Sequence, residues 1–438
     1  MKFGILSKEV GSTGWWVRLK EEGHEVKVAR TDEHYDYVGD GLYDTLETVD
    51  ALVDFRPDVI IVDSSGKGRE ADILRRHGFL VIGGCDFADT LEGKREISQG
   101  IAEECGIMVP MTESFSTIEA TMDWVKHSGD KTWVFKSDKY LEASATYVSS
   151  SPKELLQYLG YIKKRFGNDI QNIVQEKIEG VALSTAAWWN GTTFLKPFLG
   201  TIEHKKFMDN DVGPATGCSL NLVWAYQGDP LIAEHLQFDK LAEVFRRAGA
   251  TPGVYDINAV ISKHDRLPYF LEFTPRFGYD SEPTSLRGLR MPLGEFFARL
   301  ANGTLAEVPL PTDEAWMAVR VSVPPYPTEV VKDEKHSAVG TPILGIDGLY
   351  AGHFFAYGVR KGEDQYEVAS PFGELGIVAT TGTDVQVMGD NILKFIHKMQ
   401  VPNLQYRSDA VAVISKDLTK LKKLGYYTNR SIEWPSQA

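Results

Sequence analysis

The sequence predicts a protein of the α/β and α+β classes that begins with a doubly wound parallel sheet. Near the N-terminus, short apolar runs alternate with segments of helical length, which is typical of parallel strands joined by helices. Further along, apolar runs follow one another with only a turn between them, which is typical of antiparallel strands. The chain of 438 residues is long enough for roughly three domains of ordinary size.

The parallel sheet is expected before residue 84. The loop over residues 7–14 follows the first strand and opens a helix, where free N–H groups favour anions. Because this loop lacks a complete G-x-G-x-x-G pattern, a phosphate site and an ordinary loop are both open there. The expected strands are 2–6, 25–29, 58–63 and 79–83, and the expected helices are 12–22 and 70–77.

A smaller α+β unit is expected next. Lys94 heads a helix that runs to Cys105, and a later strand over 132–136 ends in Lys136. The Lys136 amine either reaches a ligand or stays in solvent, and the pattern by itself favours neither. The other expected elements are helices 117–126 and 152–166, strands 147–148 and 172–176, and a loop over 137–146.

A long loop between strands is expected near the middle of the chain. Residues 203–217 are polar and rich in glycine and proline, which favours a loop of specific shape. Earlier, Asn190 followed by Gly191 is a hairpin turn signal. The expected elements around this loop are two strands within 183–199, an amphipathic helix over 231–248, and strands over 253–261 and 269–273.

Polar side chains on the last two of these strands indicate a site for metal and phosphate. Asp256, Asn258 and Glu272 are expected on one face, because side chains alternate along a strand. Oxygen ligands grouped in this way suit Mg²⁺. Arg276 follows four residues after Glu272, where its guanidinium can bind phosphate or carboxylate oxygens. Taken alone, an acid and an arginine near a strand end are more often a surface ion pair, so both interpretations are open.

Composition limits the classes of partner. The net charge of −14 argues against duplex nucleic acid, which binds basic surfaces. A small anionic substrate is still open, because His204, Lys205 and Lys206 form a local basic cluster. The three cysteines fit neither a zinc pattern nor a disulfide framework, which favours a reducing cytoplasm. The sequence shows no signal peptide and no apolar run of about 20 residues that could span a bilayer.

Five segments together resemble the phosphoribosylamine–glycine ligase (glycinamide ribonucleotide synthetase) family of the ATP-grasp superfamily. The pair of lysines after His204, followed at fixed spacing by Asp-x-Gly-Pro-x-Thr-Gly, is specific, and its joint occurrence with Glu-Phe-x-x-Arg-Phe-Gly makes chance an unsatisfactory explanation. The chain is identified as a diverged member of this family, and the order of the segments matches over nearly its whole length. These segments are 91–94, 134–136, 175–180, 204–217 and 272–278.

The resemblance implies an ATP-grasp fold and a ligase activity. In this family ATP phosphorylates a carboxylate, and an amine attacks the acyl phosphate to give an amide, ADP and phosphate. Glycine and phosphoribosylamine, in purine biosynthesis, are the default substrates. The implied parts are 1–110, an N-terminal preATP-grasp (Rossmann-like) domain; 111–182, the ATP-grasp lid subdomain; 183–310, the ATP-grasp core; and 311–438, a C-terminal α+β domain.

The resemblance also implies site residues, with ATP and Mg²⁺, or Mn²⁺ in its place, as cofactors. The implied catalytic residues are Lys136, Asp211 and Arg276. The implied ATP-binding residues are Lys94, Lys136, Glu176, Lys177, Ile178, Glu179 and Lys205. The implied substrate-binding residues are His204, Asp211, Gly213, Pro214, Thr216, Gly217 and Arg276. The implied metal ligands are Glu272, Asp256, Asn258 and Thr274.

The sequence departs from the family pattern mainly where substrates bind. The family's asparagine two residues after the metal-binding glutamate is Thr274 here, a weaker oxygen ligand. The loop after Lys136 keeps a lysine but has no glycine. Residues 8–16 and 63–68 replace the family's Gly-Gly-Arg-Glu-His-Ala and Gly-Pro-Glu loops, and Cys218 stands where the family continues with glycines. The fold and the ATP chemistry are therefore better supported than the identity of the acceptor.

Three functions are open at this point. The first is the family's own ligase reaction, favoured by the retained loop over 211–217. The second is a diverged ATP-grasp ligase that joins another amino acid to another amine or modified nucleotide, favoured by the lost phosphate loop. The third is a degenerate ATP-binding protein without turnover, and intact Lys136, Glu272 and Arg276 argue against it. In each case we expect small-molecule partners and a cytoplasmic monomer or homodimer.

Overall fold

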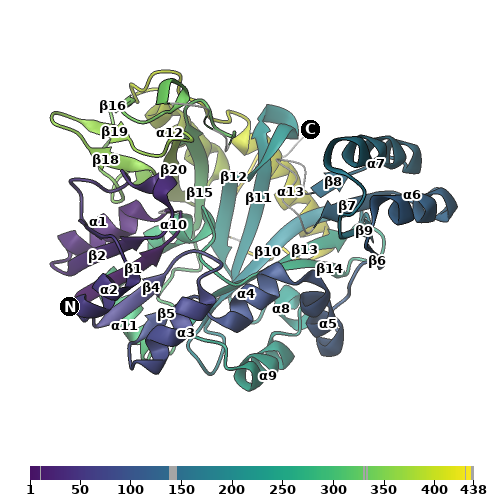
Figure 1. Ribbon diagram of the computed structural model, residues 1–438, viewed down its shortest axis with the longest axis horizontal. Coiled ribbons are helices and arrows are strands. Elements are labelled where there is room, and N and C mark those ends of the chain that lie inside the picture. The colour runs from purple at the N-terminus through teal and green to yellow at the C-terminus, as the bar shows by residue number, and fades with distance from the viewer. Residues whose placement is uncertain (10, 138–145, 329–330, 332–333, 430, 436–438) are drawn as a thin grey trace.

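The computed structural model describes residues 1–9, 11–137, 146–328, 331, 334–429 and 431–435 (Figure 1). Most of the loop predicted over 137–146 lies outside the described residues. Within them the chain forms a parallel sheet at the N-terminus, a lobe of four strands and two helices, and a large antiparallel sheet in the middle. No helix of the described residues is both long and apolar enough to cross a membrane.

The N-terminal sheet is parallel, as the sequence predicts, and its strands lie in the order β3-β2-β1-β4-β5. Strand β3 and helix α2 were not predicted. Alternate residues of each strand face two different cores. Ile5 and Ile61 pack with α1 on one face, while Leu6 and Ile60 pack with α2 and α3 on the other. The elements are β1 (Lys2–Ser7), α1 (Thr13–Glu21), β2 (Glu25–Arg30), η1 (Glu33–Tyr35), β3 (Asp44–Leu46), α2 (Val49–Phe55), β4 (Val59–Val62), α3 (Gly68–Arg76) and β5 (Val81–Ile82).

A lobe projects from one side of the molecule (Figure 1), and we call it the lid. Its antiparallel strands lie in the order β6-β9-β7-β8. Ile118, Trp133 and Leu155 belong to a core of its own between this sheet and its two helices. The elements are β6 (Thr112–Phe115), α6 (Ile118–His127), β7 (Trp133–Ser137), β8 (Thr146–Val148), α7 (Pro152–Phe166) and β9 (Asn172–Glu176), preceded by α4 (Asp86–Gly93) and α5 (Arg95–Cys105).

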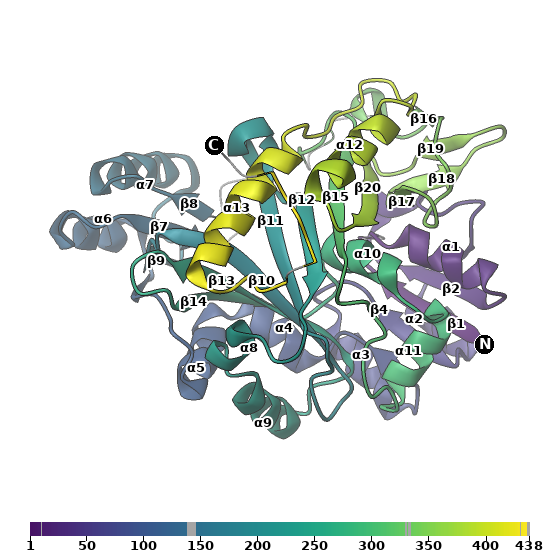
Figure 2. The ribbon, with the colours of Figure 1, turned by 180° about the vertical axis from the view of Figure 1, so that it is seen from behind.

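The central antiparallel sheet has eight strands in the order β14-β13-β10-β11-β12-β15-β20-β17. It runs across residue 310, where a domain boundary is predicted, so that division of the chain stays a prediction. Helices α12 and α13 lie across its back (Figure 2). The elements are β10 (Gly180–Trp189), β11 (Leu199–Met208), β12 (Val212–Ala225), β13 (Gly253–Ser262), β14 (Pro268–Thr274), β15 (Ala315–Ser322), β17 (Phe354–Ala356), β20 (Glu374–Gly382), α12 (Val385–Ile396) and α13 (Ala410–Leu424).

Shorter elements complete the described chain. A sheet in the order β16-β19-β18 lies beside the N-terminal sheet, where the N–H of Gly39 donates to the carbonyl of Val359 at 2.9 Å. These elements are η3 (Asp209–Asp211), α8 (Leu231–His235), α9 (Phe238–Ala248), α10 (Ser281–Ser285), η4 (Leu286–Gly288), α11 (Leu293–Ala301), η5 (Glu334–His336), β16 (Pro342–Ile343), β18 (Val359–Lys361) and β19 (Tyr366–Val368).

Three expectations for the middle of the chain are wrong. Residues 203–217 form the paired strands β11 and β12, not a loop, and their polar character reflects an exposed hairpin arm. The helix expected over 231–248 is two helices, because Gln237 between them has a left-handed φ of 52°. After the turn that begins at Asn190, regular strand resumes only at Leu199.

Candidate active site

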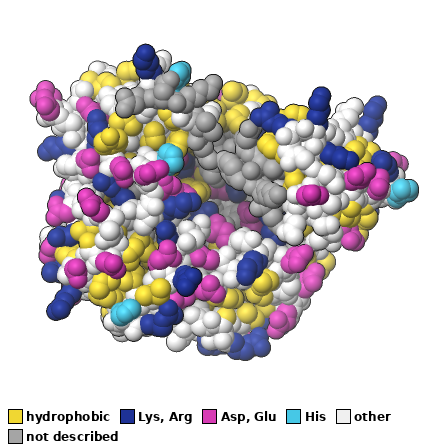
Figure 3. All heavy atoms as spheres, in the orientation of Figure 1, with side chains coloured by type: hydrophobic (Ala, Val, Ile, Leu, Met, Phe, Trp, Pro, Cys, Tyr) yellow, Lys and Arg dark blue, Asp and Glu magenta, His cyan; other side chains and the backbone are white. Residues whose placement is uncertain are grey.

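A hollow lies between the lid and the rest of the molecule, with charged side chains beside it (Figure 3). The connection from β9 to β10 forms the junction, and it carries Glu176, Lys177, Ile178 and Glu179. The N–H of Glu176 donates to the Met111 carbonyl at 2.8 Å, and the Glu176 carboxylate accepts from Lys131 at 3.0 Å. Glu179 is paired with Lys263 of the β13–β14 turn. These four predicted ATP-binding residues therefore lie where the lid meets the rest of the molecule.

Lys136 projects from β7 of the lid sheet. Its Nζ donates to Oε1 of Gln175 at 2.9 Å, and only 7% of the residue is exposed. Burial lowers the pKa of Lys136 to about 8, against the opposing effect of the Glu272 carboxylate. A buried lysine whose hydrogen-bond partner in the described part of the chain is a neutral amide would gain from an anion placed beside it. Of the two interpretations left open, the buried position favours the ligand.

Lys205 lies on β11, opposite the lid. Its Nζ is 3.5 Å from Glu203 and 3.7 Å from Glu272 on β14. The Glu203 carboxylate raises the pKa of Lys205 most, with Glu272 adding to it, so this amine is held as a cation. Burial opposes ionisation of Glu272, yet Lys205 and Lys136 lower the pKa of its carboxyl. Two lysines from two lobes thus act on one carboxylate.

The predicted metal ligands share one face of the β13–β14 pair, as expected. Asp256 lies opposite Thr274 and Asn258 opposite Glu272. The Asn258 amide donates to Thr274 Oγ1 at 3.0 Å and to Asp256 Oδ2 at 3.4 Å, and Ser184 donates to Asn258 Oδ1 at 2.5 Å. These contacts hold the side chains together in one patch.

The fit of this patch to a cation rests on Asp256. Its buried Oδ1 has no hydrogen-bond partner among the described residues, and burial, with Glu282 and Glu203 nearby, raises its pKa to about 8. In the described ranges, no three histidine, cysteine or acidic side chains converge on one point. Mg²⁺ is commonly held by one or two carboxylates together with substrate phosphates. The patch therefore suits a cation that is also coordinated by a nucleotide, and it does not suit a cation coordinated by protein side chains alone.

Arg276 follows β14 and is held on two sides. Its Nε is 3.2 Å from Glu92 at the end of α4, and its Nη1 donates to the Phe277 carbonyl at 3.1 Å. The guanidinium lies 4.7 Å from the centre of the Tyr279 ring. Arg276 is therefore oriented by its neighbours and partly neutralised by Glu92. It lines a pocket that also reaches the N-terminal sheet.

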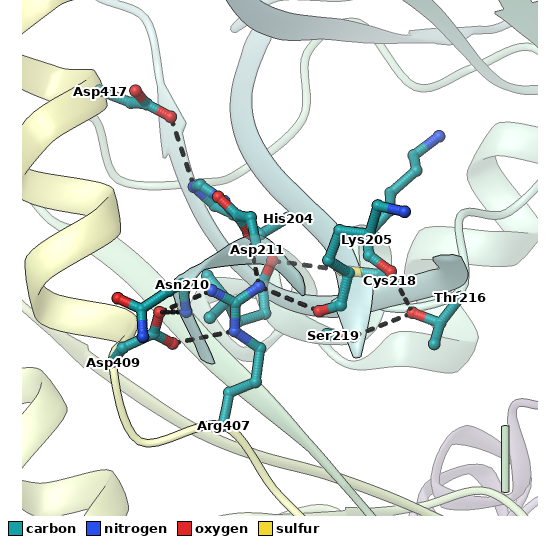
Figure 4. A network of polar contacts seen from close by, with 12 residues as sticks. His204, Lys205, Asn210, Asp211, Thr216, Cys218, Ser219, Arg407, Asp409 and Asp417 are labelled. Carbon is teal, nitrogen blue, oxygen red and sulfur yellow. Dashed lines mark hydrogen bonds and ion pairs between the residues drawn. The ribbon is translucent and has the colours of Figure 1, made fainter. Parts of the chain in front are cut away.

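The tip of the β11–β12 hairpin is fixed to the C-terminal part of the chain (Figure 4). Arg407 donates to Asp211 at 2.7 Å and to Asp409 at 2.8 and 2.9 Å. His204 Nδ1 lies 2.9 Å from Asp211, and its Nε2 lies 3.4 Å from Asp417 of α13 at ion-pair distance. We call these five residues the hairpin latch. It occupies Asp211 with protein partners, which sequence reasoning did not foresee.

The remaining predicted substrate residues shape the same hairpin. Gly213 has a left-handed φ of 80°, and Thr216 Oγ1 donates to the Lys205 carbonyl at 2.9 Å. A Cβ on Gly217 would lie 2.7 Å from the Tyr279 ring, so only glycine allows that ring to pack there. Pro214 lies between Gly213 and Gly217 in β12. Lys94 is further away in the chain and lines a hollow between the start of α5 and the lid strands.

The pocket that Arg276 lines joins the ends of β1 and β4 to the segment after β14, and we call it the acceptor pocket. Thr216, Gly217 and Arg276 are predicted to bind substrate, and a phosphate site is open over residues 7–14. Sequence reasoning did not bring the other lining residues into one site, because they come from distant parts of the chain. Arg320 is paired with buried Asp280 at 2.5 Å, and Tyr357 donates to Asp280 at 2.8 Å. The described lining residues are Lys8, Glu9, Gly11, Ser12, Asp32, His34, Tyr35, Asp63, Ser64, Ser65, Ala215, Thr216, Gly217, Arg276, Phe277, Gly278, Tyr279, Arg320, Tyr326, Pro327, Tyr357, Gly358, Phe372 and Glu374.

The lid, the junction and the central sheet define an ATP-grasp protein, and the comparisons agree. The family model "Phosphoribosylglycinamide synthetase, ATP-grasp (A) domain" matches residues 93–282. Phosphoribosylamine–glycine ligase of Thermotoga maritima has a similar structure, with a TM-score of 0.72 at 19% identity, over 93% of this chain and all of that one. The biotin carboxylase domain of Hydrogenobacter thermophilus 2-oxoglutarate carboxylase, solved with MgADP, has a TM-score of 0.64 at 12% identity, over 98% and 96% of the two chains.

The curated relatives specify the class further. Phosphoribosylamine–glycine ligase of Corynebacterium ammoniagenes is 24% identical over 312 residues, which is 69% of this chain and 71% of that enzyme. The enzyme of Mycobacterium tuberculosis is 23% identical over 354 residues, 77% and 79% of the two chains. The chain is thus an ATP-grasp carbon–nitrogen ligase related to the phosphoribosylamine–glycine ligases. This confirms the resemblance inferred from the motifs.

Proposed function

We propose that this ligase joins a carboxylate to an amine through an acyl phosphate, with release of ADP and phosphate. The observation that carries the proposal is the convergence of Lys136 from the lid with Lys205 and Glu272 from the central sheet. Transfer of a phosphoryl group needs charge neutralisation and exclusion of water more than it needs a protein nucleophile. The buried Lys136 amine and the half-exposed Lys205 amine face one carboxylate across the junction and provide that neutralisation.

Each group has a defined task in this mechanism. Lys136 and Lys205 would bind phosphate oxygens, and Lys94 would add a further positive charge at the start of α5. Glu272 and Asp256 would hold Mg²⁺ or Mn²⁺, with Asn258 and Thr274 as neighbouring oxygen donors. The cation, when bound, offsets phosphate charge. These roles are proposals drawn from position and chemistry.

Arg276 would orient the carboxylate that receives the phosphoryl group. It lies after β14, beside the acidic patch, and it also lines the acceptor pocket. A fixed guanidinium there can hold a carboxylate in line with the incoming phosphate. Glu176 to Glu179 would contact the nucleoside at the junction. The acceptor pocket would hold the amine on the side of Arg276 away from the nucleotide.

Glycine and phosphoribosylamine are the first pair to test, because the relatives carry the name of that ligase. A second candidate, a ligase with another amine acceptor, is favoured by the acidic Asp63 in the acceptor pocket. We also propose a cytoplasmic protein that is a monomer or homodimer. The three cysteines are buried and unpaired, which suits a reducing compartment.

Hydroxylamine tests the ligase proposal without knowledge of the acceptor, because it attacks acyl phosphates directly. The protein is incubated with Mg-ATP, hydroxylamine and a panel of carboxylates that begins with glycine, and ADP and hydroxamate are measured. We expect both products with at least one carboxylate, in equal amounts. Tight ATP binding with no ADP from any carboxylate would contradict the proposal and favour a degenerate ATP-binding protein. A parallel assay with glycine and fresh phosphoribosylamine tests the default pair.

A further inference from the structure

The acceptor pocket is unusually acidic for a site that would hold a phosphorylated sugar. Four carboxylates line it, those of Glu9, Asp32, Asp63 and Glu374. Two of its walls are aromatic, with Tyr35 and Tyr357 both buried. The enclosing rings limit the access of water, which strengthens the effect of each charge inside.

The cations of this pocket already face carboxylates. Arg320 is paired with Asp280 at 2.5 Å, and both side chains are more than nine-tenths buried. Arg276 is 3.2 Å from Glu92. Lys8 lies 3.8 Å from Glu9 at the mouth, where 47% of the lysine side chain is exposed. Of the described residues, six carboxylates therefore stand against three permanent cations in the pocket and its immediate wall.

Asp63 is the group that most needs a ligand. The residue is 8% exposed and lines the pocket at the end of β4. Its Oδ1 accepts a hydrogen bond from Ser64 at 2.7 Å. Among the described residues, no partner meets hydrogen-bond geometry at the buried Oδ2. Burial raises the pKa of Asp63 to about 6, with Glu9 adding to the effect. The hydroxyls of Ser64 and the nearby Ser7 lower the pKa of this carboxyl and so oppose the effect of burial. A hydrogen-bond donor that carries positive charge would satisfy the oxygen and keep the carboxylate ionised.

One feature would favour an anion instead. Gly11 and Ser12 line the pocket at the start of α1, and a helix N-terminus attracts negative charge. That end contributes about half an elementary charge. A phosphate monoester would bring between one and two negative charges into the space beside Asp63 and Glu9. The balance of charge therefore opposes a phosphate.

We propose that the acceptor of this ligase is a primary amine without a phosphate group. It binds as an ammonium ion against the Asp63 carboxylate, with its body against the tyrosine walls, and gives one proton to that carboxylate. The neutral amine then attacks the acyl phosphate, and phosphate leaves as the amide bond forms. The inference rests on the proposed ligase function and specifies the substrate class of its second site. The inference gives this chain a different acceptor substrate from that of its phosphoribosylamine-using relatives. It leaves the proposed ATP-binding part of the site unchanged.

Glucosamine and glucosamine 6-phosphate provide a matched test, because they differ by one phosphate. Binding of each to the full chain with Mg-ADP is measured by calorimetry at low salt, together with 1,4-diaminobutane and ribose 5-phosphate as simple cationic and phosphorylated probes. We expect each phosphate-free amine to bind at least about tenfold more tightly than its phosphorylated counterpart. Asp63→Asn should reduce amine binding about tenfold or more, while Asp44→Asn, at an exposed site on β3, should leave it unchanged.

The outcomes separate the two proposals. Preference for glucosamine 6-phosphate or ribose 5-phosphate would overturn the acceptor inference, and so would failure of every phosphate-free amine to bind. Unchanged amine binding by Asp63→Asn would overturn the role of Asp63. The hydroxylamine assay decides the ligase function independently, since it bypasses the acceptor. Hydroxamate formation together with phosphate preference would thus refute this inference alone.

Discussion

Replacing Arg407 with alanine should release the tip of the β11–β12 hairpin. Arg407 is 1% exposed, and it donates to Asp211, to Asp409 and to the Lys206 carbonyl. Removing one partner of a buried ion pair typically costs about 3–5 kcal/mol. The Asp211 side chain is 43% exposed and can be hydrated again, so we expect a smaller local loss of about 2–3 kcal/mol.

Amide hydrogen exchange measures this loss where it occurs. The Asn210 N–H donates to Asp409 Oδ2 at 2.7 Å, so a peptide covering the hairpin tip reports on the latch. A loss of about 2–3 kcal/mol corresponds to roughly 30- to 150-fold faster exchange. Arg299→Ala is a matched control, because Arg299 is 43% exposed and paired only with Glu295 along α11. Exchange at the tip within about threefold of wild type would refute the latch.

Four further predictions concern the nucleotide site and the latch. Lys136→Ala should weaken ATP binding about tenfold or more, as measured by calorimetry, and an unaltered affinity would show that this amine contacts no nucleotide. Arg276→Ala should lower turnover by on the order of 100-fold, and unchanged kinetics would remove it from the mechanism. Asp256→Asn should stabilise the metal-free protein increasingly from about pH 4 and most fully above about pH 8, because burial raises the folded pKa of this carboxyl from its ordinary value to about 8. The same change should weaken Mg²⁺ binding, and thermal unfolding with and without Mg²⁺ checks both. Although burial opposes it, Asp417 and Asp211 raise the pKa of His204, so its stabilising effect is full below about pH 6.5 and is lost as pH rises through the folded pKa. The gap in urea midpoint between wild type and His204→Gln should therefore shrink from pH 6 to pH 8.5, and a constant gap would contradict this.

Local sequence patterns were sufficient for most of the secondary structure. The alternation before residue 84 predicts four of the parallel strands and the helices α1 and α3, and the structure confirms them. The shared face of Asp256, Asn258 and Glu272 also follows from the sequence, since side chains alternate with a period of two residues. These properties depend on neighbours in the chain, so they can be inferred without knowing the fold.

The hairpin over 203–217 shows where such patterns fail. An exposed hairpin arm needs no apolar face, so its residues carry turn-forming and polar signals in place of strand alternation. Pairing with a neighbouring strand decided the outcome, and β12 is held by β11 on one side and β15 on the other. Gln237, which divides the expected helix over 231–248, has a left-handed backbone conformation, and glutamine as a residue type does not predict it.

The sequence by itself indicated the resemblance to ATP-grasp ligases and most of the strands and helices, and it predicted residues for the nucleotide site. Only the tertiary structure brought Arg407 to Asp211, 196 residues away in the chain, and Asp280 to Arg320. It also placed Asp63 in one pocket with Arg276. The physical reason is that ion pairing and burial depend on distance in space, and side chains that are far apart in sequence show no shared local pattern from which that distance could be inferred.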